Sequence, residues 1–190
     1  MSNALASTID ELSPRQRQTF DALLDAAEDE IRSVGFNGLT VRNVAARAEV
    51  APATAYNYFG SKEHLVGEVF WRRLSHLPPT KLDRRHTPAK RITAVLGEIS
   101  MLIADEPELS AACTTALLAD DQLVKSLRER IGAEVHGRLV DALGVDDPVV
   151  VGALELAYSG ALLLSGTGHL SYDLLGERLA DAAELIVGTD

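Results

Sequence analysis

The sequence predicts an all-α protein of about nine helices, built as a small N-terminal domain followed by a larger helical domain. The 190 residues are 46% hydrophobic but only 5% aromatic, so the core consists mainly of Ala, Leu and Val, a composition typical of packed helices. Capping residues followed directly by proline, as in Ser13-Pro14 and Asp147-Pro148, are typical of helix starts. Apolar residues also recur at helical spacing, as in Phe20, Leu23, Leu24, Ala27, Ile31 and Val34.

Four helices are expected in the first part of the chain, after a polar arm at residues 1–12. The first begins at Ser13-Pro14 and ends at Gly35, because glycine commonly ends helices. Thr40 caps the second, and the third runs from about Pro52 to Tyr58. The first three helices are expected to form a domain at residues 13–60, and the fourth a connecting helix at 61–76.

Residues 77–190 are expected to form the second domain, which begins with a linker marked by Pro78, Pro79 and Pro88. The most apolar window, Val149 to Leu170, contains Glu155, Gly and Ser, and is interpreted as a buried helix rather than a membrane span. Five helices are expected after the linker, at about 88–104, 107–118, 121–143, 148–170 and 172–187.

The net charge of −10 argues against a protein that coats nucleic acid without regard to sequence. Up to Lys62 the chain has 6 Lys+Arg against 8 Asp+Glu, and the remainder has 12 against 20. The N-terminal part is therefore the less acidic one, and any contacts it makes with phosphates are expected to be few and local.

The segment Leu39 to Lys62 predicts a helix-turn-helix motif, in which two short helices are joined by a tight turn. The second helix of such a motif enters the major groove of DNA with its N-terminal residues near the base edges. Small residues at that position, here Ala51-Pro52-Ala53, allow a close approach. The hydroxyl of Thr54 can bond a base or a phosphate, and its methyl group can contact thymine.

Other side chains of this segment are suited to the DNA backbone. Tyr56 and Tyr58 offer hydroxyls to phosphates. Arg42 is placed to reach a guanine or a phosphate, and Lys62 suits a phosphate. Simpler interpretations stay open: the tyrosines could be half-buried packing residues, Arg42 an ordinary exposed charge, and Thr54 a support for the helix start.

Taken together, the segment Gly38 to Ala45, the residues from Val50 through Tyr56-Asn57-Tyr58-Phe59, and Ser61-Lys62 closely resemble the N-terminal domain of TetR-family transcriptional regulators. The resemblance covers about Arg15 to Phe70. It implies a homodimer of all-helical subunits, each with a three-helix DNA-binding domain and a larger ligand-binding domain. It also implies that a small molecule releases the protein from a palindromic operator.

The resemblance implies DNA contacts at nine positions. These are Thr40, Arg42, Pro52, Ala53, Thr54, Tyr56, Asn57, Tyr58 and Lys62. The sequence departs from the family where Ala51-Pro52-Ala53 replaces the Ser, Lys, Arg or Gly often found at the start of the recognition helix. Base preference is therefore expected to depend on Arg42, Thr54 and apolar contact with thymine.

The two C-terminal helices are expected to form the dimer interface, with two helices from each subunit in a four-helix bundle. The alternative is that one of these helices is buried entirely within its own subunit. The candidate interface residues are Val149, Val150, Ala153, Leu154, Ala157, Ala161, Leu162, Leu179, Ala182, Ala183, Leu185 and Ile186.

By the same resemblance, a ligand pocket lies among the helices after the linker. The candidate lining residues are mostly apolar, which favours a hydrophobic or amphipathic effector. The alternative is that they fill an ordinary core. They are Trp71, Leu74, Met101, Leu102, Cys113, Leu117, Tyr158, Leu162 and His169.

No pattern in the sequence suggests a cofactor, a metal or catalysis. The five histidines lack metal-ligand spacing, and Cys113 has no sequence partner for a zinc site. A single cysteine fits a reducing compartment, and the start MSNALASTIDEL has neither a basic beginning nor a long apolar run. A cytoplasmic protein without membrane association is therefore expected.

The sequence thus predicts a DNA-binding transcriptional regulator, with a homodimeric, ligand-released repressor as the preferred hypothesis. An activator, or a repressor without an effector, is the alternative within regulation. A small-molecule-binding protein that has lost DNA recognition is a second alternative, favoured by the acidic charge and the apolar start of the recognition helix. An enzyme is a third, and only turnover of a ligand would support it.

Overall fold

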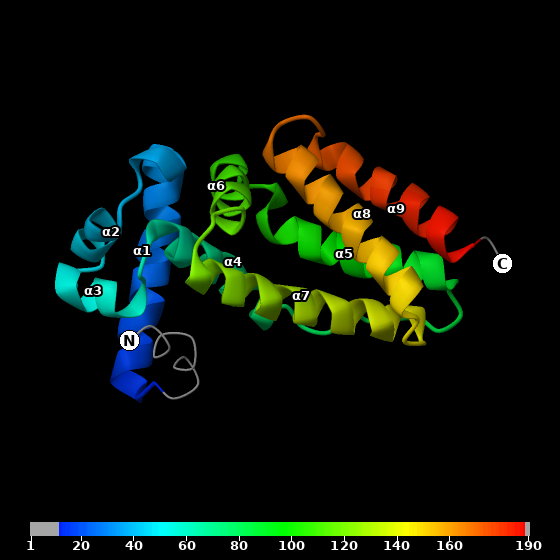
Figure 1. Cartoon of the computed structure of the whole chain (residues 1–190), viewed down its shortest axis with the longest axis horizontal. Coiled ribbons are helices and arrows are strands. Elements are labelled where there is room, and N and C mark those ends of the chain that lie inside the picture. The colour runs from blue at the N-terminus through cyan, green and yellow to red at the C-terminus, as the bar shows by residue number, and fades with distance from the viewer. Residues whose placement is uncertain (1–11, 189–190) are drawn as a thin grey trace. The chain divides into compact units, whose positions relative to one another are not determined.

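The computed structural model describes residues 12–188, and the expected arm at 1–12 lies almost wholly outside them. Within the described residues the predicted all-α fold is confirmed, with nine helices and no strands (Figure 1). The helices are α1 (Pro14–Gly38), α2 (Val41–Arg47), α3 (Pro52–Tyr58), α4 (Lys62–His76), α5 (Pro88–Ala104), α6 (Pro107–Leu117), α7 (Gln122–Leu143), α8 (Pro148–Gly166) and α9 (Tyr172–Val187).

Local capping chemistry explains most of the helix starts. The hydroxyl oxygen of Ser13 accepts a hydrogen bond from the backbone N–H of Gln16, whose side chain bonds back to the Ser13 N–H, forming a capping box. Thr40, Thr87 and Asp147 accept backbone N–H groups in the same way at the starts of α2, α5 and α8. These starts therefore depend on neighbouring residues alone, which is why the sequence predicts them well.

Two helix ends differ from expectation. The path of α1 is broken at Gly35, with φ 65° and ψ 179°, but a further turn follows up to Gly38. The predicted role of Gly35 as a breaking point is retained, since this backbone region is open essentially only to glycine. Helix α8 ends at Gly166 rather than near 170, because Gly168 (φ 77°) turns the chain there and His169 N–H bonds back to Leu164 O.

The described chain divides into two compact units. Unit 1 combines the chain up to Arg72 with Glu106–Glu129, and unit 2 combines Arg73–Asp105 with the chain from Arg130. Helices α4 and α7 therefore contribute to both units. Residues 106–129 pack with the N-terminal helices rather than with the rest of 77–190.

In unit 1, α1 packs against α2 and α6, and α2 packs against α3 (Figure 1). Gly67 allows α7 to approach α4 closely, because a Cβ there would lie 2.6 Å from a methyl of Leu127. The core of this unit includes Phe20, Leu23, Leu24, Ile31, Leu39, Val44, Ala45, Ala55, Phe59, Leu65, Val69, Leu109 and Leu127.

In unit 2, α9 lies beside both α5 and α8 (Figure 1). The side chain of Arg91 is buried in this unit. Its guanidinium donates to the carbonyls of Ala142 and Leu143 and so caps the C-terminal end of α7. The core includes Ile92, Val95, Leu96, Ile99, Leu139, Val151, Leu154, Tyr158, Leu175, Leu179 and Ala183.

The expectation that the most apolar helix is buried is wrong. Among the described residues α8 is the one helix long and apolar enough to cross a membrane by length and composition, yet only 22% of its most apolar window is buried. Its Glu155 carboxylate lies 2.8 Å from Nδ1 of His136 on α7. The helix thus packs one face on its own unit and leaves an apolar face exposed.

Candidate nucleic-acid interface

The turn between α2 and α3 is built from backbone hydrogen bonds and one left-handed residue. The N–H of Val50 reaches back to the carbonyl of Ala45 at 2.9 Å, and Glu49 adopts φ 55°. Glycine is the usual residue at such a position, since a side chain there is strained. The geometry is that of a helix-turn-helix motif, as the sequence predicts.

A small apolar cluster holds the two helices on α1. Val44 and Ala45 of α2 and Ala55 of α3 are fully buried. Phe59, which directly follows α3, stacks on Phe20 of α1 with ring centroids 5.1 Å apart. The inner face of α3 is therefore fixed, and its other faces remain available to a partner.

The exposed side of α3 consists of predicted DNA-contact residues. Pro52, Ala53, Tyr56 and Asn57 are exposed, and Thr54 is half-buried. The side chain of Tyr56 is 52% exposed, so the alternative that it is a packing residue does not hold. No side chain caps the start of α3, where the N–H of Thr54 bonds instead to the carbonyl of Ala51 at 2.9 Å.

Tyr58 differs from Tyr56. It is half-buried, and its ring meets the edge of Phe20 with centroids 5.9 Å apart. The ring of Tyr58 is therefore a packing residue against Phe20, as one interpretation of the sequence held. A contact between its hydroxyl and DNA stays a prediction.

At the start of α2, Thr40 and Arg42 are both exposed. The hydroxyl oxygen of Thr40 accepts the N–H of Asn43 at 3.0 Å, so this residue is a helix cap whatever else it contacts. Its O–H remains a donor that can reach a phosphate. Arg42 lies in the first turn of α2, and its contact with DNA also stays a prediction.

Lys62 has a protein partner that the sequence does not reveal. Its Nζ donates to the carbonyl of Phe36 at 3.0 Å and lies 4.3 Å from the centre of the Phe36 ring. These contacts join the start of α4 to the end of α1. An ammonium group has three donors, so a phosphate contact remains compatible with this geometry.

Two polar side chains, Glu30 and His64, are buried in the helices that flank the motif. Glu30 of α1 is 8% exposed and accepts hydrogen bonds from Arg47 of α2, with Nε and Nη2 each 2.9 Å from its Oε2. This pair fixes α2 on α1, and the only sequence signal for it is a carboxylate on the apolar face of α1. His64 is 6% exposed, and its Nε2 lies 3.6 Å from the buried carboxylate of Glu68.

The start of α7 is also tied to this unit. Asp121 accepts the N–H groups of Leu123 and Val124 at 2.8 and 3.1 Å. Burial acts to raise the pKa of Asp121, but these bonds, the hydroxyl of Ser61 and the nearby His64 outweigh it and hold the pKa below its ordinary value. Asp121 is therefore an ionised helix cap.

The predicted pocket residues are distributed over both units. Trp71, Cys113 and Leu117 belong to unit 1, and the remaining six belong to unit 2. Leu74, Cys113 and Tyr158 are buried, whereas Trp71, Leu102, Leu117 and Leu162 are half-buried. Leu117 lies 3.5 Å from the position of a Cβ on Gly67, which is packing inside unit 1.

Met101 and His169 require a correction, because both are exposed and neither lines an interior. Met101 is 57% exposed, since the buried face of α5 runs through Ile99, Ser100 and Ile103. His169 lies in the turn after α8, with Nδ1 3.1 Å from the hydroxyl of Thr167.

The predicted interface residues also separate by burial. Leu154, Leu179 and Ala183 are at most 2% exposed, so they pack inside unit 2 and cannot present contacts to a second subunit. Val150, Ala153, Ala157, Ala161, Ala182 and Ile186 are half-buried. The predicted Val149 and Leu185 are strongly exposed, whereas four other exposed apolar side chains of α8 and α9 were not predicted: Leu156, Leu163, Leu164 and Leu174.

No group of three or more His, Cys, Asp or Glu able to hold a metal ion is found among residues 12–188. The features of unit 1 are instead a buried helical scaffold, a tight turn, and a short helix with exposed polar and small side chains. A helix-turn-helix DNA-binding protein is the class of molecule that this geometry defines.

Comparisons with known proteins agree with this class. The family described as bacterial regulatory proteins, tetR family, matches residues 23–69. An uncharacterised HTH-type transcriptional regulator of Mycobacterium tuberculosis is 44% identical over 176 residues, covering 91% of this chain and 82% of that protein. The HTH-type transcriptional repressor KstR of the same species is 26% identical over 185 residues, covering 93% of this chain and 84% of that protein.

Among solved structures, a TetR transcriptional regulator from Rhodococcus sp. RHA1 has the same fold, with a TM-score of 0.78 at 22% identity over 91% of this chain and 97% of that one. The chain belongs to the TetR family of DNA-binding transcriptional regulators. Members of this family bind DNA and typically dimerise, and the family is one of regulators rather than of enzymes.

Proposed function

We propose that the protein is a homodimeric repressor that reads a palindromic operator through α3 and leaves it when a hydrophobic or amphipathic small molecule binds. One observation carries the DNA-reading part. Helix α3 is fixed from behind by buried Ala55 and Phe59, while Tyr56 and Asn57 on its other side are exposed. A rigidly held helix with exposed polar groups is what major-groove reading requires.

The nine DNA contacts are part of this proposal. Arg42 and Thr54 are assigned to base edges, with Pro52 and Ala53 in apolar contact. Thr40, Tyr56, Tyr58 and Lys62 are assigned to phosphates, and Asn57 to either. The net charge of −10 means that few phosphates are neutralised, so affinity is expected to depend on fit at the bases more than on bulk electrostatics.

Repression is favoured over activation by the relatives named as repressors, among them KstR from Rhodococcus jostii, which is 29% identical over 196 residues. The relatives are bacterial, so the proposed site of action is the cytoplasm, where bacterial DNA is found. A repressor and an activator differ in the sign of the effect on a reporter gene placed behind the operator.

The second subunit is assigned to the exposed apolar face of α8 and α9. The leucines Leu156 and Leu185 are 76% and 86% exposed, and Val149 is 79% exposed. Side chains of this size and number on one face favour burial against a like surface. A dimer is also what a palindrome requires, since each subunit occupies one half-site.

The effector part rests on the apolar character of the unit 2 helices. Tyr158 and Leu162 of α8, together with Leu74 and Leu102, provide mainly apolar groups with few polar ones. The proposed effector class is tested by adding apolar ligands to the protein–operator complex. A true effector both raises the Tm of the free protein and weakens the complex.

The experiment that tests the proposal selects binding sites from a randomised DNA duplex library with the full-length protein. A repressor of this kind should enrich an inverted repeat whose half-sites lie about one helical turn apart, on the order of 34–36 Å. Affinity for the enriched site should fall as salt is raised, with a shallow slope. Failure to enrich any sequence would instead favour a small-molecule-binding protein that has lost DNA recognition.

A further inference from the structure

A histidine of α4 is buried directly behind the end of the recognition helix. His64 is 6% exposed, and its ring centroid lies 5.9 Å from that of Phe59, the residue that ends α3. The Nδ1 atom of its imidazole is buried and has no hydrogen-bond partner among the described residues. Most buried polar atoms in proteins are hydrogen-bonded, so this imidazole requires an explanation.

Two carboxylates lie close to this ring. The Nε2 atom of His64 is 3.6 Å from Oε1 of Glu68, which is 2% exposed and lies one turn further along α4. The second carboxylate is that of Asp121 at the start of α7, which is close enough for His64 to lower its pKa. The Nζ of Lys62, two residues before His64, is directed to a carbonyl of α1 instead. His64 thus has a carboxylate of its own helix and one of α7 beside it, with the apolar ring of Phe59 at the end of α3.

The same region connects the turn after α3 to the start of α7, inside unit 1. The hydroxyl oxygen of Ser61 accepts the N–H of His64 at 3.1 Å, and its O–H donates to the carboxylate of Asp121. A Cβ on Gly60 would lie 2.9 Å from a methyl of Leu123, so α7 also packs tightly on this turn. The position of the end of α3 therefore depends on contacts that α4 and α7 make around Ser61 and His64.

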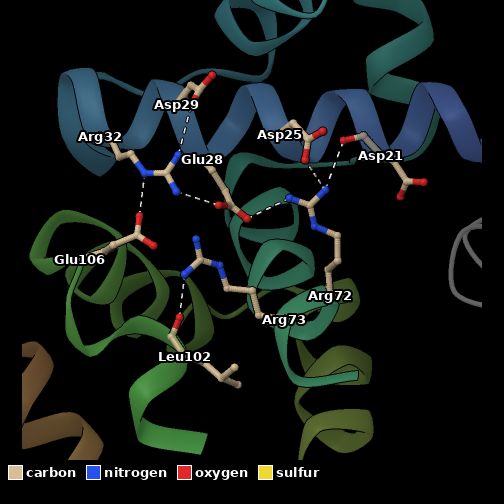
Figure 2. A network of polar contacts seen from close by, with 9 residues as sticks. All are labelled: Asp21, Asp25, Glu28, Asp29, Arg32, Arg72, Arg73, Leu102 and Glu106. Carbon is tan, nitrogen blue, oxygen red and sulfur yellow. Dashed lines mark hydrogen bonds and ion pairs between the residues drawn. The ribbon is translucent and has the colours of Figure 1, made fainter. Parts of the chain in front are cut away.

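His64 is also the one histidine of unit 1, and histidine is the side chain that ordinarily titrates between about pH 5 and 8. The other four histidines, at positions 76, 86, 136 and 169, belong to unit 2. The polar network on α1 keeps its charge over this range, because Glu28 accepts from two arginines, Arg32 and Arg72 (Figure 2). A hydrogen bond to Glu106 raises the pKa of Arg32. His64 is therefore the side chain expected to change the charge of unit 1 near neutral pH.

We propose that His64 is a positioning residue for DNA reading whose protonation strengthens operator binding. The inference rests on the proposed function. A proton on His64 attracts the imidazole to both carboxylates, which holds the turn after α3 more firmly between α4 and α7. The cation also lies two residues from Lys62, which is assigned to a phosphate, so bound DNA favours the charged form of His64. Operator affinity is therefore highest where His64 is protonated, and it falls as the pH rises and the proton is lost.

The test measures the pH profile of operator binding, which a merely structural role would not affect. Fluorescence anisotropy uses a labelled DNA site selected by the full-length protein. It gives the affinities of the wild type, His64→Gln and Asp121→Asn between about pH 6 and pH 8 at constant ionic strength. Calorimetry in buffers of different ionisation enthalpy counts the protons taken up on binding. His76→Gln is the matched control, because His76 is an exposed histidine of the same helix that belongs to unit 2.

The wild type and His76→Gln should bind roughly fivefold or more tightly at about pH 6 than at about pH 8, with uptake of protons. His64→Gln should change by less than about twofold and should lose this uptake, because glutamine keeps hydrogen-bonding groups but is not protonated in this range. Asp121→Asn should shift the profile to lower pH, since it removes one of the two carboxylates that favour the cation.

Three results would overturn the inference: the same profile and proton uptake in the wild type and His64→Gln, a wild-type affinity that does not change with pH, or one that rises with pH. Urea unfolding at each pH shows whether the variants are folded. If His64→Gln does not fold, an identical profile in Asp121→Asn and the wild type overturns the inference. A wild type that selects no DNA sequence at any pH contradicts the proposed function itself, so the two failures are told apart.

Discussion

At the scale of single residues, the sequence predicts chemistry better than it predicts partners. The small and polar residues of α3 were identified from their order in the chain, and the exposure of Tyr56 agrees with that assignment. The partners of Lys62 and Arg32 were not predicted. Phe36 is 26 residues from Lys62 and Glu106 is 74 from Arg32, and one sequence contains no signal for pairs that distant.

Tyr56 offers a direct test of the DNA-reading assignment. Tyr56→Phe should weaken operator binding, by about 1 kcal/mol for one lost hydrogen bond to phosphate. The Tm should stay unchanged, because the side chain is 52% exposed and its ring is retained. Mobility shifts and thermal unfolding measure the two effects. A large fall in Tm with unchanged DNA binding would assign the hydroxyl a structural role instead.

Glu49 offers a test of the turn. Its φ of 55° is strained for any residue with a Cβ, so Glu49→Gly should stabilise the protein by about 0.5–1 kcal/mol in urea unfolding. The neighbouring Ala48 has φ −80° and is the matched control. Ala48→Gly should be destabilising, because glycine there only adds freedom to the unfolded chain. Equal effects of the two substitutions would contradict this explanation of the turn.

At the scale of helices, most boundaries could be predicted because caps are local. Prolines and hydroxyl or carboxylate caps gave the starts of α1, α5 and α8 within a residue. The burial of α8 was misinterpreted for a physical reason. Apolar residues on a helix predict that a face will be covered, but they do not distinguish cover by the same subunit from cover by another.

Asp121 carries the prediction at this scale. Asp121→Ala should cost about 0.5–2 kcal/mol at pH 7, because two backbone N–H groups at the start of α7 lose their acceptor. The pKa of Asp121 is lowered in the folded state. Its contribution is therefore fully present above the unfolded pKa of about 3.9 and is lost as the pH falls through the folded value.

Urea unfolding of the wild type and of Asp121→Ala at pH 7 and at about pH 3.5 measures this dependence. The difference between the two proteins should shrink at the lower pH. Asp121→Asn keeps a capping oxygen without the charge, and should recover most of the stability lost by the alanine variant. A difference that is the same at both pH values would show that the charge does not contribute.

At the scale of the whole molecule, the family and the all-helical architecture followed from the sequence, whereas the composition of the units did not. Residues 106–129 lie with the N-terminal helices, an arrangement that depends on contacts between α1 and α6 far apart in the chain. The predicted interface also needed the structure, since exposure separates Leu156 from buried Leu154, two positions away on the same helix.

Leu156 provides the test of assembly. Leu156→Glu should convert the dimer to a monomer at micromolar concentration, because it places a charge in the proposed apolar interface. Sedimentation velocity measures the change. The Tm of the monomer should show no loss from packing within the subunit, since the side chain is 76% exposed. Leu118→Glu, at a residue 65% exposed in unit 1, is the control and should leave the oligomeric state unchanged.

The open face of α8 has a consequence for the life of the protein in the cell. A newly synthesised subunit that has not dimerised exposes several leucines of this 19-residue helix to water. Chaperones and proteases select chains by such surfaces. Monomers should therefore be degraded quickly. The steady-state concentration of the protein should rise more steeply than its rate of synthesis, because dimerisation depends on concentration.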